Sequence, residues 1–390
     1  MTMTGIRQGH PLRSAESSSD RPAAALSVTL EDALDDADWS DLEGRLRPEI
    51  RFLAAGWWQA WAKALLPHGN WRGPLRLLVA RDHQGVVQAV LPLAEQIMAG
   101  ITVQSLAGGY APFRTLLIAE TAPDDTAEAL VAFLAEEIKP KAFRFGPVEA
   151  NRPEIRALIK ALKTKGWHFC LINSGEDHLL DLPDDLESYE ATVPKKQRQR
   201  MNALRRRLDD QGEVQLRRYR GLEPAEWNRI FDQLALVERA SWLASKGGDF
   251  TYADPGQAAF WRHYISDEAA AKALSVWVMS INDQPISFNV ALDSGPCRYG
   301  LFCHYDEALK SFAPGNIVNR ETIVTSFEDG LGHLNLGRGD SGNKARFGAN
   351  RTEALEDWMT MPPTAAGRVL HLAACAKFRA NIEKSAVRDA

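Results

Sequence analysis

The segment from residue 274 to residue 348 constrains the fold more than any other part of the chain, because its strand, turn and helix signals follow one another without interruption. Three apolar runs predict consecutive strands: 274–281, 285–292 and 297–306. A loop at 307–316 then carries Pro-Gly near its end, and the apolar periodicity of 317–330 predicts a helix. A helix that begins at Pro-Gly after a strand leaves backbone N–H groups free at its N-terminus, where a phosphate or pyrophosphate group can bind.

Short motifs in and around this segment are spaced as in a known family: Tyr305-Asp306, Pro314-Gly315, Gly330, the run Leu-Gly-Arg-Gly-Asp at 336–340, and Lys344. With this order of motifs the chain resembles the GNAT acetyltransferase superfamily, and within it the CelD/BcsL-like branch, which is related to the FemABX aminoacyltransferases. The resemblance is best over residues 185–350. It implies an α/β fold of the GNAT-like α+β kind, with a mixed, mostly antiparallel sheet flanked by helices. It also implies acyl transfer from a thioester such as acyl-CoA, whose pyrophosphate would bind at the Pro-Gly helix start.

Two parts of the sequence align with each other, which indicates an internal repeat. Residues 75–94 align without a gap to residues 274–293, each with a strand, a polar turn and a second strand. The later run FRFG at 143–146 corresponds in order to LNLG at 334–337. Two tandem GNAT-like domains are therefore predicted, in agreement with the resemblance. We place the acyl-donor site in the second domain, since only that repeat has Pro-Gly at a helix start.

The predicted organisation has five parts. A disordered tail at 1–24 precedes an N-terminal GNAT-like domain at 25–183. A basic linker helix at 184–212 leads to a C-terminal GNAT-like domain at 213–362, which holds the acyl-donor site, and a C-terminal helix follows at 363–390. The tail is rich in Ser, Arg and Pro and lacks the apolar region of a secretory signal. No apolar run is long enough to cross a bilayer. The four scattered cysteines show neither zinc-ligand spacing nor a disulfide framework, so a cytoplasmic protein is expected.

A basic stripe lies in the predicted linker helix, although the net charge of the protein is −5. Its seven cations are Lys195, Lys196, Arg198, Arg200, Arg205, Arg206 and Arg207. One interpretation is a solvated helix that packs through its apolar residues. We favour an anionic partner, because no acid balances the stripe before Asp209. The candidates are CoA phosphates, an acyl-carrier protein, tRNA, and anionic lipid at the inner face of the membrane, which 195–207 would touch from the periphery. The negative charge of the whole protein argues against DNA as a partner.

Eleven tryptophans are a high count, and three of them, Trp57, Trp58 and Trp61, lie close together in the first half. We favour packing in the core as the explanation. An apolar ligand groove or a membrane-facing patch is the alternative.

The phosphate-binding residues are predicted at the start of the helix after the Pro-Gly pair. Gly315, Asn316 and Ile317 should offer backbone N–H groups, with Pro314 fixing the entry to the helix and Lys310 nearby. The alternative is an ordinary strand-to-helix turn. The usual GNAT phosphate loop contains more Gly and basic residues, so a CoA thioester and an acyl-carrier-protein thioester both stay open as donors. Neither a metal nor a tightly bound cofactor is expected; acyl-CoA would act as a co-substrate.

Two residues are candidates for the general base that takes a proton from the amine. His304 ends the strand before the Pro-Gly loop, and imidazole titrates near neutrality. Its neighbour Tyr305 is a candidate substrate-binding residue. Glu238 is expected on a helix at 224–243, on the same face as Trp242, in a region that lines the acceptor site in the resembling family. The alternatives are a histidine bonded to the backbone and a surface carboxylate paired with a cation.

The loop at 337–348 is dense in glycine and charged residues and follows a short apolar strand. The resemblance places Asp340 and Lys344 at polar loop positions of the family. Lys344 could orient a carbonyl or a phosphate, Asp340 could hold Lys344 or the amine, and Arg338 is a candidate substrate-binding residue. The alternative is a flexible loop with solvated charges.

Together these features predict an N-acyltransferase that moves an acyl group from acyl-CoA to an amine. The tryptophan-rich first half and the basic stripe suit a lipid acceptor, such as a sphingoid base in a ceramide synthase-type reaction. One alternative is a FemABX-like aminoacyl transfer to a cell-wall precursor, with the basic stripe holding tRNA. Another is a non-catalytic accessory of exopolysaccharide or cellulose biosynthesis, because a fold does not fix a function.

Overall fold

The computed structural model describes residues 26–53, 55–68, 70–109, 112–248, 250–339 and 342–388. The predicted disordered tail at 1–24 lies outside these ranges, as does the candidate site residue Asp340.

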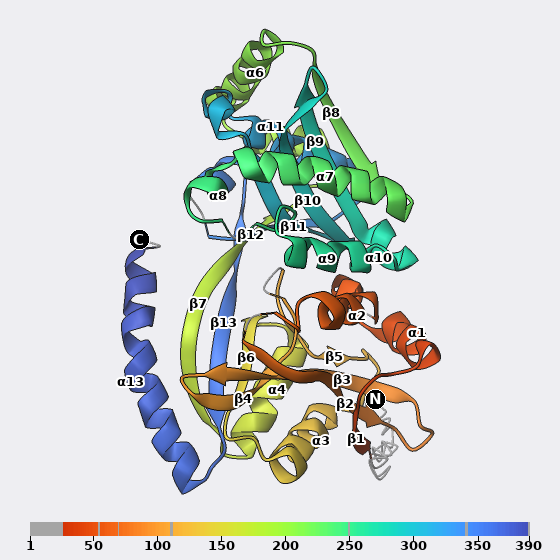
Figure 1. Ribbon diagram of the computed structural model, residues 1–390, viewed down its shortest axis with the longest axis vertical. Helices are drawn as coiled ribbons and strands as arrows, with labels where there is room; N and C mark the ends of the chain where they lie inside the picture. The colour runs from red at the N-terminus through yellow and green to blue at the C-terminus, as the bar shows by residue number, and fades with distance from the viewer. Residues whose placement is uncertain are drawn as a thin grey trace, which may run out of the picture.

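One continuous sheet runs through the described part of the chain (Figure 1). Its strands are β1 (Ser27–Glu31), β2 (Trp71–Arg81), β3 (Val87–Met98), β4 (Ile101–Leu106), β5 (Leu117–Ile118), β6 (Phe143–Glu149), β7 (His168–Asp181), β8 (Val214–Arg220), β9 (Leu274–Ile281), β10 (Gln284–Ser294), β11 (Cys297–Tyr305), β12 (His333–Arg338) and β13 (Arg351–Met361). They lie in the order β1-β2-β3-β4-β6-β13-β7-β12-β11-β10-β9-β8, and β5 pairs with β3.

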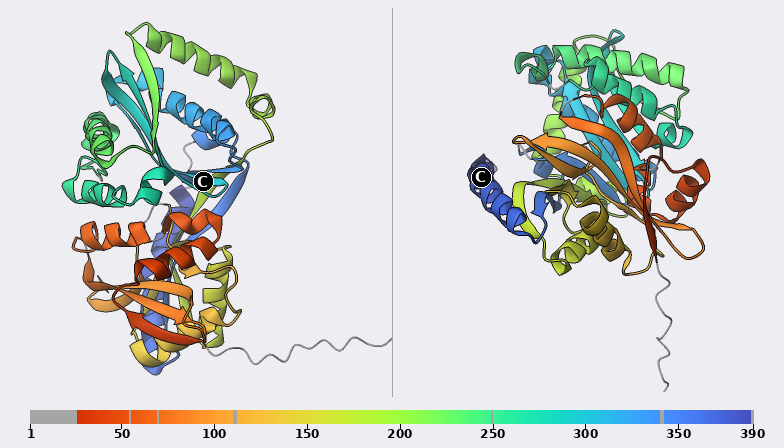
Figure 2. Two further views of the ribbon diagram at one scale, coloured as in Figure 1. Left: turned by 90° about the vertical axis from the view of Figure 1, so that its right-hand side faces the viewer. Right: turned by 60° about the horizontal axis from the view of Figure 1, so that its bottom comes forward.

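Helices cover both faces of this sheet (Figure 2). The α-helices are α1 (Asp36–Arg45), α2 (Ala55–Ala64), α3 (Thr126–Phe133), α4 (Pro153–Thr164), α5 (Leu186–Thr192), α6 (Lys195–Asp209), α7 (Pro224–Ala240), α8 (Trp242–Ser245), α9 (Pro255–Tyr264), α10 (Glu268–Ala273), α11 (Pro314–Glu328), α12 (Asn343–Arg346) and α13 (Ala365–Arg388). Two 3-10 helices, η1 (Pro48–Leu53) and η3 (Glu307–Phe312), and one π-helical segment, η2 (Leu134–Ile138), are also present among the described residues. Proline begins α4, α7, α9 and α11, as its fixed φ and missing N–H favour.

The two halves repeat one pattern of strands. In β1-β2-β3-β4-β6 and in β8-β9-β10-β11-β12, three antiparallel pairings are followed by one parallel pairing. The aligned sequence runs form the hairpins β2-β3 and β9-β10. The prediction of an α/β fold with two tandem GNAT-like domains, each with a mixed, mostly antiparallel sheet flanked by helices, is confirmed.

The final strand of each half lies in the sheet of the other. β7 follows the first repeat but pairs with β12 of the second, whereas β13 ends the second repeat and pairs with β6 of the first. β7 and β13 also pair with each other in antiparallel register. The exchange joins the two sheets into one, so the sequence segment 213–362 contributes a strand to the N-terminal half.

Helices α2 and α9 face each other between the two halves (Figure 1), and an aromatic layer joins them. Trp57 of α2 packs edge-on against Phe260 and Tyr264 of α9, with ring centroids 4.9 and 5.5 Å apart. Trp58 and Trp61 are also buried. The three clustered tryptophans are therefore core residues, and the layer rigidly couples the halves because such aromatic contacts bury large apolar areas.

The C-terminal helix α13 runs along β7 (Figure 1). Leu370, Ala374 and Phe378 pack with Cys170 and Met359 of the sheet in one apolar cluster. The predicted C-terminal helix thus packs on the core through these residues. Within the part of the chain that the structure describes, we find no helix with both the length and the apolar character needed to span a bilayer.

Candidate active site

The second half contains a fork between two parallel strands. β11 and β12 are paired only from Cys297 to Tyr299 and from His333 to Asn335. Beyond these pairs β11 continues to Tyr305 beside β10, and β12 continues to Arg338 beside β7. The edge of β11 that faces β12 therefore presents backbone N–H and C=O groups that a ligand inserted into the fork can bond.

A bulge shapes β11 at the point where the fork opens. Val290 of β10 faces Phe302 while Ala291 faces Gly300, so Leu301 is an extra residue on β11. A bulge breaks the regular pairing and turns the strand locally, as bulges near functional sites commonly do. After the bulge, Phe302 and His304 face α7, α8 and α9, whereas Cys303 and Tyr305 face α11.

The start of α11 lies against the open end of β11. A Cβ on Gly315 would stand 3.0 Å from the Tyr305 ring and 3.4 Å from the Cys303 sulfur, so glycine permits this close approach. The amides of Asn316 and Ile317 both donate to the carbonyl oxygen of Ala313, at 3.0 and 3.4 Å. The prediction that these two amides are free is therefore wrong. Since Pro314 has no N–H and the amides of Asn316 and Ile317 are bonded, Gly315 is the residue of these four whose backbone N–H is left for an anion.

The predicted phosphate-binding residues differ in their surroundings. Pro314, Gly315 and Ile317 are buried, and Pro314 occupies the first helical position, as predicted. Lys310 lies in η3, and its ammonium forms an exposed ion pair with Glu307 at 2.6 Å. Lys310 can therefore turn towards a bound anion only by giving up a surface pair, which is worth little in water.

The basic helix α6 packs beside the start of α11. Met201 and Leu204 of α6 share an apolar cluster with Ile317 of α11. The Arg207 guanidinium lies 5.3 Å from the centre of the Phe312 ring, just before the helix start. The fold thus brings the basic stripe and the Pro-Gly helix together, although more than a hundred residues of sequence separate them.

The corresponding fork of the first half differs in charge. β4 and β6 are paired in parallel only at Gln104 and Ser105, so they also form a fork. The helix that follows β4 in the chain is α3, and two acids, Asp124 and Asp125, directly precede it. Carboxylates at a helix N-terminus repel an anionic ligand, whereas the first turn of α11 holds no acid. This contrast supports the choice of the second half for the donor site.

His304 lies on β11 with its ring between Trp242 and Phe288, at centroid distances of 6.3 and 5.4 Å. Burial lowers the pKa of His304 to about 4, so the imidazole is neutral near pH 7. Its Nδ1 has no hydrogen-bond partner among the described residues. The ring is therefore unprotonated near pH 7, but a pKa this low makes it a weak base, and its Nδ1 is buried, so a substrate would reach this nitrogen only if neighbouring side chains moved.

Glu238 is fully buried, and its carboxylate is held by the backbone. The amides of Thr251, Tyr252 and Ala253 donate to its oxygens over 2.7–3.2 Å. Burial raises the pKa of Glu238, and these hydrogen bonds oppose that effect. The carboxylate thus positions a loop, which fits its surroundings better than proton transfer does.

Trp242 does not share a helix with Glu238, contrary to prediction. α7 ends at Ala240, and the Ser241 hydroxyl then accepts a hydrogen bond from the Leu243 amide to begin α8. Trp242 is 39% exposed and lies near His304 instead.

Lys344 folds back over the end of β12. Its Nζ donates to the carbonyl oxygens of Gly337 and Arg338, at 2.5 and 2.9 Å. The Arg338 side chain passes over Gly175 of β7. Lys344 thus lies at the end of β12 nearest the open part of the fork, and the Arg338 side chain lies over β7.

Buried acids at the closed end of the fork were missed by sequence reasoning. Asn335 donates to Asp177 at 2.9 Å and to Glu149 at 3.5 Å, and Arg152 pairs with Glu149 while donating to the Tyr299 hydroxyl at 3.0 Å. Burial raises the pKa of Glu149 to about 7, outweighing the opposite effect of Arg152. Tyr299 and Asn335 are the last paired residues before the strands diverge, so a group that titrates near neutrality lies close to the bottom of the fork. No motif links these residues, which come from different strands and loops.

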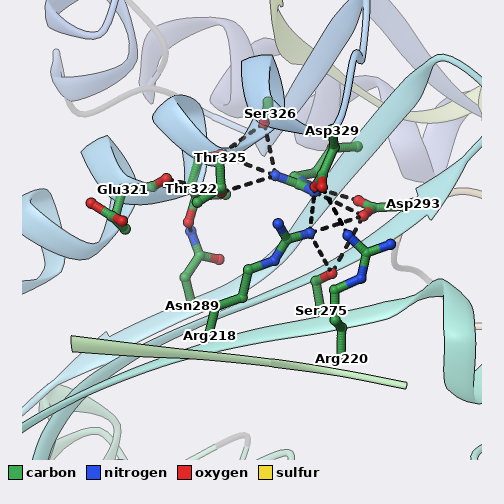
Figure 3. A network of polar contacts seen from close by, with 11 residues as sticks. Arg218, Arg220, Ser275, Asn289, Asp293, Glu321, Thr322, Thr325, Ser326 and Asp329 are labelled. Carbon is green, nitrogen blue, oxygen red and sulfur yellow. Dashed lines mark hydrogen bonds and ion pairs between the residues drawn. The ribbon is translucent and has the colours of Figure 1, made fainter. Parts of the chain in front are cut away.

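A buried ion network fixes the other end of α11 to the sheet (Figure 3). The Arg298 guanidinium donates to Asp293 at 2.7 and 2.8 Å and to Asp329 at 2.5 Å. It also donates to the Thr322 carbonyl oxygen and to the Ser326 hydroxyl. Because breaking one partner of a buried pair is strongly destabilising, this network holds α11 in place and so fixes its start at the fork.

Comparison with known families agrees with this geometry. Residues 195–345 match the family described as "Acetyltransferase (GNAT) domain". This part of the chain is therefore similar to a GNAT-type domain. It contains the fork, α11 and the basic helix α6. We found no curated protein that matches the chain.

Solved structures share the whole two-half architecture. FemX has 11% sequence identity and a TM-score of 0.56, covering 88% of this chain and 100% of FemX. A protein of unknown function from Bacteroides thetaiotaomicron VPI-5482 has 13% identity and a TM-score of 0.51, covering 86% of this chain and 100% of its own. L-PGS from Bacillus licheniformis has 14% identity and a TM-score of 0.50, covering 88% of this chain and 96% of its own. At such identities these similarities show a shared fold and not a shared activity.

Proposed function

We propose that this protein is an N-acyltransferase of the CelD/BcsL-like branch, which moves an acyl group from acyl-CoA to an amine. We further propose a lipid amine as the acceptor, such as a sphingoid base in a ceramide synthase-type reaction. The observation that carries the proposal is the fork of β11 and β12 with the start of α11 at its open end. No bound cofactor or metal is part of the proposal.

The dimensions of the fork suit a thioester donor. From Tyr305, which contacts Gly315 of α11, to Tyr299, where pairing begins, β11 extends about 20 Å at roughly 3.3 Å per residue. An extended phosphopantetheine arm can follow this unpaired edge. Its phosphates would then lie at the start of α11, near the cations of α6, and its thioester near the closed end of the fork.

The chemistry needs few groups from the protein. The neutral amine attacks the thioester carbonyl carbon, a C–N bond forms, the C–S bond breaks, and the thiolate leaves. Free N–H groups on the edge of β11 would stabilise the oxyanion that develops during the attack. The proton lost by the amine would pass to a base, for which neutral His304 and the buried Glu149 are the two candidates.

The basic helix supports a peripheral location. The exposed cations of α6 would meet CoA phosphates on the side of α11 and anionic lipid on the outer side. We propose that the protein works in the cytoplasm, at the inner face of the membrane, where a lipid amine is available. An acyl-carrier protein, itself anionic, is the alternative donor for the same surface.

A FemABX-like aminoacyl transfer is the second candidate, favoured by the shared fold of FemX. In that case α6 would hold tRNA, and binding would weaken steeply as salt rises, because each phosphate contact releases counterions. A salt titration of tRNA binding therefore separates the two candidates.

The deciding experiment combines binding and product detection. The purified protein is heated with CoA and with acyl-CoAs from acetyl to palmitoyl, and a ligand at one hundred times its Kd should add about 2.7 kcal/mol of stability. The same thioesters are then incubated with a long-chain amino alcohol, and free thiol and N-acyl product are measured. Release of thiol together with an amide product would support the proposal. Failure of CoA and every thioester to bind would overturn it and favour the tRNA-dependent candidate.

A further inference from the structure

An apolar cavity lies between the two halves, on the face of β11 opposite α11. Its volume is about 740 Å³. Aromatic side chains form part of its wall, with Trp57 from α2, Phe260 and Trp261 from α9, and Phe302 from β11. This volume is in the range of known small-molecule sites, which are mostly apolar with a few polar groups. Four polar residues also line it: His68, Thr251, Asp254 and Gln257.

The cavity adjoins the fork through β11. Phe302 is the first residue after the bulge, and His304 follows on the same face of the strand. The start of α11 contacts Cys303 and Tyr305 on the other face. A donor held at α11 would therefore reach the fork from one side of β11, and the cavity offers the second substrate an approach from the other side.

The buried Glu238 fixes one wall of this cavity. The Glu238 carboxylate accepts hydrogen bonds from the amides of three consecutive residues, 251–253. The first of these, Thr251, lines the cavity. The next residue, Tyr252, packs its ring 6.2 Å from that of Phe302. An acid in the core is expensive to bury unless it is hydrogen-bonded, and here the hydrogen bonds set the path of the loop. The arrangement indicates a preformed cavity and not a chance gap.

We propose that this cavity binds the hydrocarbon chain of the acceptor amine, with the amino group directed towards β11 at the fork. This inference rests on the proposed function and deepens it, since it identifies the acceptor as an amine with a long hydrocarbon chain. Apolar burial supplies the affinity, so each methylene that enters the cavity should tighten binding about three- to fourfold.

The test is direct binding of linear primary alkylamines, from hexylamine to hexadecylamine, without a donor and below their micelle concentrations. Tryptophan fluorescence is a suitable signal, because Trp57 and Trp261 line the cavity. Affinity should rise with chain length until the cavity is full. Affinity that does not depend on chain length would overturn the inference.

A variant that fills the cavity tests the inference, and the same substitution at an exposed position serves as its control. Gly109 lines the cavity, and a Cβ there would have the Trp57 ring 4.0 Å away, so Gly109→Leu should occupy space meant for the chain. Gly44→Leu makes the same substitution on exposed α1, where a Cβ would meet nothing within 4 Å. Gly109→Leu should abolish the dependence on chain length, and Gly44→Leu should keep it. If Gly109→Leu does not fold, Thr251→Leu fills the cavity from another wall.

The same variants distinguish this inference from the proposed function. Stabilisation by CoA should be unchanged in Gly109→Leu, because the donor site lies on the other face of β11. If Gly109→Leu instead weakened palmitoyl-CoA and left alkylamines unaffected, the cavity would hold the acyl chain of the donor and the inference would be wrong. If alkylamines bound with the expected dependence but no thioester bound, the cavity would stand and the proposed donor would fall.

Discussion

At the scale of single residues, burial assigns different roles to groups that look alike in sequence. Glu238 and Glu149 are both buried acids, but three backbone amides hold the first, while the second pairs with Arg152 and has a pKa raised to about 7. His304 is only partly buried by exposed area, but desolvation of its ring lowers its pKa to about 4. Sequence reasoning found Glu238 and His304 from their positions, but it could not find Glu149, whose neighbours come from distant strands.

Glu149 should make the stability of the protein depend on pH. Its folded pKa of about 7 lies above the ordinary value of 4.5, so the folded state holds a proton that the unfolded state releases between these values. Stability should therefore fall as pH rises from about 4.5 to about 7, by on the order of 1–3 kcal/mol. His304 has the opposite effect between about pH 4 and pH 6.5. Because its pKa is lower in the folded state, it stabilises the fold at higher pH, and this stabilisation is lost as the pH falls through that range.

Comparison with Glu149→Gln isolates the effect of this acid. Urea unfolding at pH 5 and pH 7.5 should show a smaller loss of stability in Glu149→Gln than in the wild type. Asp124→Asn, an exposed substitution before α3, should follow the wild type. Equal pH dependence in all three proteins would show that Glu149 does not titrate in this range.

Lys344 should matter more for turnover than for folding. Its ammonium bonds two carbonyl oxygens at the end of β12, and it is only partly buried. Loss of these bonds should loosen the open end of the fork while leaving the core intact, so we expect Lys344→Ala to lower kcat at least about tenfold, as a misplaced substrate would. The melting temperature should change little, and the exposed Lys141→Ala should change neither quantity. A parallel loss of folding would assign Lys344 a purely structural role.

At the scale of elements, the contact between α11 and β11 decides whether the fork can serve as a donor site. The sequence predicted the strands, the Pro-Gly start and the helix, because these signals are local. It did not predict η3, the two amides bonded to Ala313, or the break between α7 and α8, because these depend on how the chain turns in three dimensions. The strand β13 was also missed, since the mixed run RTEALEDWMTM lacks clear alternation.

Gly315→Ala tests this contact. The added Cβ would stand 3.0 Å from the Tyr305 ring, so the start of α11 must move away from β11, with strain of about 1–3 kcal/mol. We expect the affinity for CoA, measured by calorimetry, to fall about tenfold. Gly44→Ala in α1 places a Cβ in open space and should add up to about 1 kcal/mol of stability without affecting CoA. Unchanged CoA affinity in Gly315→Ala would place the phosphates elsewhere.

At the scale of the whole molecule, the repeat could be predicted from sequence but the exchange of strands could not. The alignment of 75–94 with 274–293 reflects local patterns that each hairpin needs. The partners of β7 and β13 are instead selected by the arrangement of both halves, and nothing in either strand specifies which sheet it joins. The exchange places Glu149 and Asp177 of the first half beside Asn335 of the second, so the fork is completed only when both halves are folded.

This exchange predicts that the two halves cannot fold separately. Without β13, the pairing edges of β6 and β7 would both be open, and without β7, β12 would lose its long antiparallel partner. Exposed edges and the uncovered aromatic layer between α2 and α9 would favour aggregation of either half. Urea unfolding of the whole chain should therefore be a single transition, with tryptophan fluorescence and circular dichroism coinciding. Residues 26–183 and 184–388, expressed alone, should lack cooperative unfolding, while co-expression should restore a complex that melts like the intact chain. Two separate transitions, or a stable 26–183 fragment, would show that the exchanged strands are dispensable and that the donor site does not depend on the first half.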